Sequence, residues 1–112
     1  MKDDRIYVEH ILEAIDRIAQ YTEAGEDAFY QDTKTQDAVL RKFQTMGQAA
    51  RQMSLQTQEL APNIIWSDLI GFRNVIVHDY LGLDLQTVWS IITDELCELR
   101  PKIQSLFDLL NS

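Results

Sequence analysis

The sequence predicts an all-α fold: an antiparallel four-helix bundle in one domain, residues 1–112, with room for one short extra helix. Apolar residues recur every three or four positions in four separate stretches, which is the period of an amphipathic helix. The chain has only four Gly and two Pro, too few for the many turns of an all-β fold. The connections between the four stretches are short, so neighbouring helices should run antiparallel.

The first helix is predicted over residues 7–21, with Asp3 or Asp4 available to cap its start. Residues 26–31 are expected to add one helical turn that places Phe29 on the core. The apolar face of the first helix comprises Val8, Ile11, Leu12, Ile15, Ile18 and Ala19.

A second helix is predicted from about Thr33, because Thr33 and Gln36 have the spacing of a capping box. Gly47 lies within this helix and costs about 1 kcal/mol relative to Ala, so we expect a neighbouring helix to approach closely there. The apolar face of the second helix comprises Val39, Leu40, Phe43, Met46, Ala50 and Met53.

Two further helices follow a break at Pro62 and Asn63. The third is predicted over about 66–81, and Asp84 caps a fourth that runs nearly to the C-terminus. Pro101 lies inside the fourth helix and lacks an amide N–H, so we expect a bend there. The apolar face of the fourth helix comprises Val88, Ile92, Leu96, Leu99, Ile103, Leu106 and Leu110.

Composition suggests a soluble cytoplasmic protein. The N-terminus lacks the apolar segment of a signal peptide, and no apolar run has the length of a membrane span. The single cysteine, Cys97, excludes an internal disulfide, suits a reducing compartment and is expected to be a small core residue.

The charge distribution restricts how the chain could contact nucleic acid. A formal net charge of −8 argues against a protein that coats nucleic acid, since phosphate contacts need clustered cations. Residues 34–51 are an exception, because Lys34, Arg41, Lys42 and Arg51 outnumber the one acidic residue there. Any contact with RNA should therefore be local, and Arg41 and Arg51 are its candidates.

Polar residues at fixed offsets mark the segment "RNVIVHDY", residues 73–80, on the predicted third helix. Arg73 and Tyr80 are seven residues apart and share a face, while Asn74 and His78 stack four apart on an adjoining face. Such a cluster could bind a phosphate group, although from spacing alone a surface pair or a capping group is the more frequent reading. Two histidines and one cysteine are too few for a zinc site, so we predict neither metal nor cofactor.

The R-x4-H-x-Y segment on a helical bundle resembles the signature of the HEPN superfamily, in its HepT-like branch of toxins. The resemblance extends along the chain through "KDDRIYVEHILEAI", "QDAVLRKFQTMGQAA", "PNIIWSDLIGFRNVIVHDY" and "LDLQTVW". Gln48 departs from the pattern, because the family commonly has Glu there. The resemblance implies a two-fold homodimeric, metal-independent ribonuclease paired with an MntA-type nucleotidyltransferase antitoxin.

The resemblance also implies roles for single residues. Arg73 and His78 match the family's catalytic pair, Asn74 matches the polar residue that often follows the arginine, and Tyr80 matches the tyrosine to which the antitoxin transfers AMP. The substrate would be RNA, either mRNA or tRNA. The alternative is a non-catalytic dimer that binds a nucleotidyltransferase or a nucleotide, which the acidic net charge favours.

Overall fold

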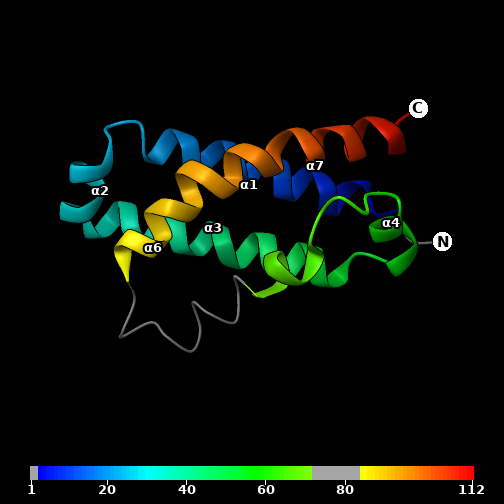
Figure 1. Ribbon diagram of the computed structural model, residues 1–112, viewed down its shortest axis with the longest axis horizontal. Coiled ribbons are helices and arrows are strands. Elements are labelled where there is room, and N and C mark those ends of the chain that lie inside the picture. The colour runs from blue at the N-terminus through cyan, green and yellow to red at the C-terminus, as the bar shows by residue number, and fades with distance from the viewer. Residues whose placement is uncertain (1–2, 72–83) are drawn as a thin grey trace.

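The computed structural model describes residues 3–71 and 84–112, and within these ranges the regular structure is entirely helical (Figure 1). The all-α prediction is therefore confirmed for the described part of the chain. Residues 66–71 are helical, as predicted for the start of the third helix, whose remainder lies outside the described residues. The elements are, in chain order, α1 (Arg5–Tyr21), α2 (Glu26–Gln31), α3 (Thr33–Gln52), α4 (Leu55–Glu59), α6 (Leu85–Ser90), the π-helical turn η2 (Ile91–Glu95) and α7 (Leu96–Leu110).

The three long helices lie side by side along the length of the molecule. α1 packs on α3 and on α7, and it runs antiparallel to both (Figure 1). The predicted apolar faces supply the core between them: every residue named for the α3 face is buried, and so is Phe29 of α2. The largest fully buried side chains are Phe29, Phe43, Ile11, Ile18, Met46, Ile103, Val8 and Val39.

The start of α3 differs from the predicted capping box. Asp32, and not Thr33, is the N-cap, because its extended backbone lets its carboxylate accept from the Lys34 amide at 3.0 Å. Gln36 does not fold back to complete the box. Its side-chain amide donates instead to the carbonyl oxygens of Phe29 and Tyr30, at 2.9 and 3.1 Å, where α2 ends. Gln36 therefore ties α2 to α3.

The first helix divides its two N-terminal acids between two tasks. Asp3 accepts a hydrogen bond from the Arg5 amide at 3.0 Å. Asp4 occupies the N-cap position but makes no side-chain cap bond, and its buried carboxylate reaches α4 instead. There its Oδ2 accepts from the Ser54 amide at 2.9 Å and from the Thr57 hydroxyl at 2.7 Å. Helix α4, which the sequence analysis did not predict, is thus anchored to the start of α1.

The last helical stretch begins as predicted but is not a regular α-helix. Asp84 caps α6 by accepting from the Gln86 amide at 3.0 Å. Upstream of Pro101, η2 replaces the α-helical pattern, and Figure 1 shows the chain changing direction between α6 and α7. Val88, Ile92 and Leu96, spaced four apart, stay buried on the core side through the π turn. The prediction that Cys97 is a core residue is wrong: its side chain is exposed.

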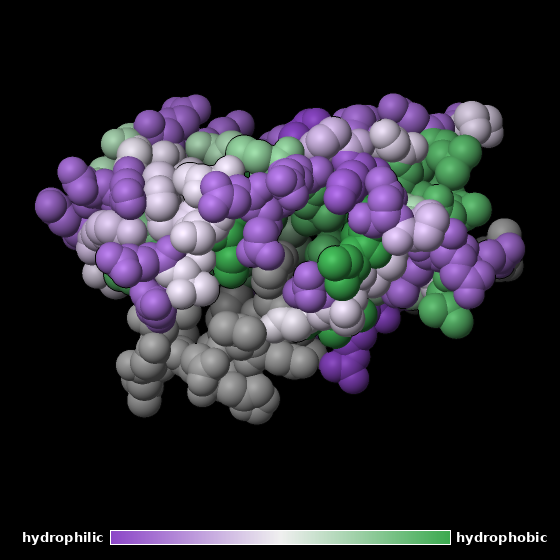
Figure 2. All heavy atoms as spheres, in the orientation of Figure 1, coloured by the Kyte–Doolittle hydropathy of each residue, from purple (hydrophilic) through white to green (hydrophobic). Residues whose placement is uncertain are grey.

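Most of the surface seen in Figure 2 is hydrophilic, and apolar side chains gather mainly toward the end that carries both termini and α4. Ile6, Leu55 and Leu109 are exposed large apolar residues of the elements at this end. Among the described helices, none is long and apolar enough to cross a membrane.

Candidate functional site

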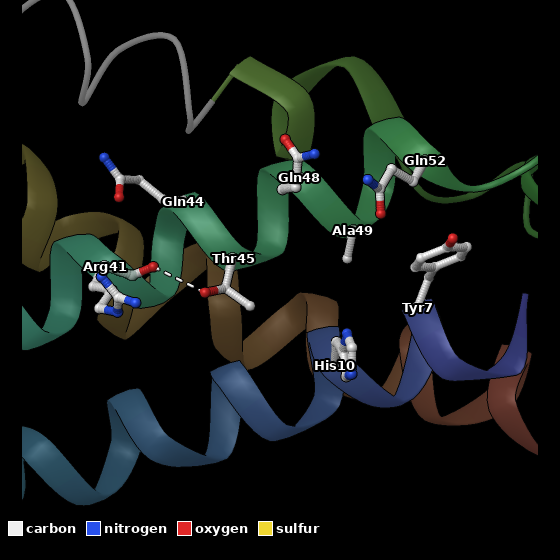
Figure 3. Close-up of a pocket in the computed structure, with 8 residues that line it drawn as sticks. All are labelled: Tyr7, His10, Arg41, Gln44, Thr45, Gln48, Ala49 and Gln52. Carbon is white, nitrogen blue, oxygen red and sulfur yellow. Dashed lines mark hydrogen bonds between the residues drawn. The ribbon is translucent and has the colours of Figure 1, made fainter.

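The four residues of the predicted motif site, Arg73, Asn74, His78 and Tyr80, lie outside the described residues. Their roles therefore stay predictions from the sequence. The described part of the chain has a different polar feature, a groove between α1 and α3 that we call the α1–α3 groove (Figure 3).

The α1–α3 groove has a volume of about 450 Å³. Positions 41, 44, 45, 48, 49 and 52 recur every three or four residues, so they form one stripe of α3 beside its buried face. Two residues of α1, three apart, face this stripe. The lining comprises Tyr7 and His10 of α1 with Arg41, Gln44, Thr45, Gln48, Ala49 and Gln52 of α3.

The two ends of the groove differ in chemistry. Figure 3 shows the Arg41 side chain at one end and the Tyr7 ring at the other, with the glutamine side chains between them. Thr45 donates its hydroxyl proton to the Arg41 carbonyl oxygen at 3.1 Å, which ties that side chain to the helix backbone. Ala49 is buried. The groove therefore offers a guanidinium, an imidazole, a row of amides and an aromatic wall.

Electrostatics make this groove unusual for the chain. No carboxylate is among its lining residues, although the chain has 18 acidic residues against 10 Lys and Arg. Within the described residues, Arg5, Arg17 and Arg100 each pair with a carboxylate, whereas Arg41 has no such partner. A guanidinium without a carboxylate partner in an acid-free groove is suited to bind an anion.

The two predicted RNA contacts do not share this groove. Arg41 lines it, and Arg51 does not. Arg51 follows Arg41 by ten residues, which places it about 80° from Arg41 around the helix axis. Gln52, one residue later, lies within about 20° of Arg41. The last α3 position in this groove is therefore Gln52, and Arg51 stays a predicted RNA contact outside it. Arg51 is exposed in the last turn of α3.

Two lining residues, Tyr7 and His10, were not predicted from the sequence. His10 is exposed, and it lies on the side of α1 that faces the α3 stripe of the groove. The available signal was the three-residue spacing that puts both side chains on one face of α1. What no local pattern provides is the packing of that face beside α3.

The acidic residues of the described chain form no metal site. No group of three or more potential metal ligands occurs in residues 3–71 and 84–112. Asp16 instead accepts from Arg100 at 2.7 and 3.1 Å and so links α1 to α7. The hydrogen bond from the Arg100 guanidinium lowers the pKa of the Asp16 carboxyl below its ordinary value and raises the pKa of Arg100. This pair is structural.

Comparison with known proteins identifies the family of this helical chain. Residues 11–106 match the family model described as "Ribonuclease HepT-like", so the chain belongs to that HEPN-type family. The resemblance found in the sequence is thereby confirmed.

Two relatives show the extent of the similarity. A Methanocaldococcus jannaschii protein named "Gamma-glutamylcyclotransferase and putative RNase" is 31% identical over 111 residues, which cover 98% of this chain and 50% of that protein. A Thermococcus cleftensis protein named "Probable ribonuclease HepT" is 32% identical over 101 residues, or 89% of this chain and 92% of that protein. This chain thus spans half the length of the first relative. No solved structure matches the chain significantly.

Proposed function

We propose that this chain is the toxin of a toxin–antitoxin pair, a metal-independent endoribonuclease that acts as a homodimer. The observation that carries the proposal is the R-x4-H-x-Y order of residues 73–80 in a chain that matches a ribonuclease family over residues 11–106. Arg73 and His78 are its catalytic pair, and Asn74 supports them.

The proposed reaction needs no metal. The 2′-hydroxyl of the substrate attacks the adjacent phosphorus, so a 2′-O–P bond forms and the P–O5′ bond breaks. One histidine takes the 2′ proton, and a second histidine gives a proton to the leaving 5′ oxygen. The products are a 2′,3′-cyclic phosphate and a free 5′-hydroxyl.

The need for two histidines is the reason for the dimer. Each chain has one histidine in the motif, His78, so a single copy lacks either the acid or the base. A two-fold axis that joins the motif helices of two copies would supply both, together with two copies of Arg73. Guanidinium groups would then neutralise the charge that develops on the pentacoordinate phosphorus.

Tyr80 is the proposed control point. Its phenolic oxygen attacks the α-phosphorus of Mg-ATP on a cognate MntA-type nucleotidyltransferase, which releases pyrophosphate and leaves AMP on the tyrosine. Each AMP adds a phosphodiester, a ribose and a base that resemble the substrate. Tethered seven residues from Arg73 on the helix predicted from the sequence, it would compete with RNA at high effective concentration.

Cleavage of RNA in EDTA tests the enzymatic proposal. Wild-type protein should cut total RNA with the chelator present, while His78→Ala purified in the same way should not. Failure of the wild type to cut any RNA would favour the alternative, a non-catalytic dimer that binds a nucleotidyltransferase or a nucleotide. Light scattering that finds a monomer with full activity would contradict the composite site.

Intact mass after incubation with the partner enzyme and Mg-ATP tests the control point. The wild type should gain AMP-sized increments, and Tyr80→Phe should gain none while it retains ribonuclease activity. Increments that persist on Tyr80→Phe would refute the assignment of the acceptor.

A further inference from the structure

We infer that the α1–α3 groove is a subsite for single-stranded RNA, in which Arg41 binds a phosphate and the neighbouring amides contact a base. The inference rests on the proposed ribonuclease function, which makes RNA the ligand, but it concerns described residues outside the 73–80 motif. The volume of about 450 Å³ lies within the usual range of ligand sites and corresponds to about one or two nucleotides.

The phosphate contact follows from the distribution of charge. The Arg5, Arg17 and Arg100 guanidinium groups lie 2.7, 3.9 and 2.7 Å from carboxylates, so an incoming phosphate would have to displace an internal partner. Arg41 has no carboxylate partner among the described residues, and its fork can bind two phosphate oxygens at once. His10 also lines the groove, but nearer its Tyr7 end, below Ala49 (Figure 3), so the phosphate contact belongs to Arg41. The chain has a net charge of −8, and the other pockets described in the structure have carboxylates in their lining. An RNA phosphate can approach the α1–α3 groove without meeting one.

The base contact follows from the glutamines. Gln36 and Gln58 donate their side-chain amides to backbone carbonyls of the protein, at 2.9 and 3.2 Å, and are therefore occupied. Gln44, Gln48 and Gln52, spaced four apart along the groove, make no such hydrogen bond within the described residues. Each offers a donor and an acceptor, which is the combination that base edges present.

The geometry favours an unpaired strand. Amides can reach the Watson–Crick edge of a base only where that base is not paired. The Tyr7 ring at the far end from Arg41 gives an aromatic surface of the kind on which unpaired bases stack. A duplex would present its backbone and hide these edges.

Binding of a fluorescent, fully 2′-O-methylated 12-nucleotide RNA measures the subsite directly, because such a probe has no 2′-hydroxyl and cannot be cleaved. Arg41→Gln should weaken binding about tenfold and reduce the slope of log affinity against log salt by about one. Gln48→Glu, which puts a carboxylate into the groove, should weaken binding at least as much. Both residues lie on the outside of α3, and thermal unfolding checks that the variants remain folded.

Arg17→Gln is the matched control. It changes the net charge by the same amount, but Arg17 is exposed on α1 outside the groove and lies 3.9 Å from Glu13. Its affinity should stay within about twofold of wild type. If Arg17→Gln and Arg41→Gln lose the same affinity for the probe, overall charge explains the effect, and the subsite is overturned. Equal binding of the annealed duplex, or equal displacement of the probe by a phosphorylated peptide of the same charge, would overturn the single-stranded RNA assignment.

Cleavage assays separate this inference from the proposed function. If the wild type binds the probe through Arg41 but cuts no RNA, the subsite stands and the ribonuclease proposal fails. If the wild type cuts RNA and Arg41→Gln changes neither the affinity for the probe nor KM, the ribonuclease proposal stands and the subsite fails.

Discussion

Replacement of Asp4 by alanine should be among the most destabilising changes to a polar residue in the described part of the chain. Asp4 is 6% exposed, and its Oδ2 accepts from the amide and hydroxyl of Ser54 and from the hydroxyl of Thr57. These bonds join the first turn of α1 to α4, about 50 residues later in the chain. Alanine removes this carboxylate acceptor and leaves the Thr57 hydroxyl with the Ser54 hydroxyl, 3.1 Å away, as its neighbouring polar group.

The expected loss of stability is about 2–4 kcal/mol. A hydrogen bond to a charged group contributes about 1.5–3 kcal/mol, but these three share one oxygen and are not additive. Ser54 is exposed and can bond to water after the change, whereas Thr57 is 8% exposed and cannot do so freely. Against a total stability of about 5–15 kcal/mol, this loss is large and corresponds to a fall in Tm of roughly 10–15 °C.

Urea unfolding followed by circular dichroism measures this effect. Thr57→Val should cost about 1–1.5 kcal/mol, and the double variant should cost clearly less than the sum of the two single changes, because they remove the same bond. Glu9→Ala, an exposed carboxylate of the same helix, is the control and should change stability by less than about 0.5 kcal/mol. A loss below about 1 kcal/mol for Asp4→Ala, or strict additivity, would show that the contact does not stabilise the fold as reasoned.

Three further predictions concern the ion pair, the cysteine and the catalytic arginine. Since Arg100 lowers the pKa of Asp16 from 3.8, the pair stabilises the fold fully above that value and loses its effect as the pH falls through the lowered folded pKa. Asp16→Asn should therefore lower the urea midpoint slightly at pH 7, and a difference from wild type that persists unchanged at about pH 2 would contradict this. Cys97 is exposed, so a thiol reagent such as Ellman's should react with it fully in the folded protein; reaction only in denaturant would mean a buried thiol. Ribonuclease activity should show a bell-shaped pH profile near the histidine range, and Arg73→Lys should not retain activity, because an ammonium lacks the planar fork; a monotonic profile or an active Arg73→Lys would reject the proposed roles.

Local sequence determined where most of the helices lie. The three- and four-residue period of apolar side chains located α1, α3 and the stretch from α6 to α7, and Asp84 marked the start of α6. This information is local because a helix of this kind forms where one face can be buried, and that face is visible in the sequence. The family motif at 73–80 was equally readable, since it depends on residue order. Cys97 was predicted to be buried because cysteine is a small apolar residue, but its position around the helix decides its exposure. It follows the buried Leu96 and is turned about 100° from the core-facing stripe.

Tertiary structure decided which partner each polar side chain takes. Asp4 stands where a capping residue is expected, yet the approach of α4 gives its carboxylate two hydroxyls and an amide, which together hold a buried charge better than one free helix amide would. Gln36 is drawn from the predicted capping box to the carbonyls at the end of α2, because α2 folds back beside it. The α1–α3 groove exists only because residues 7 and 10 pack beside residues 41–52. A linear pattern records which side chains share a helix face, but the partner across the space depends on how the helices pack, and that is set by the whole core.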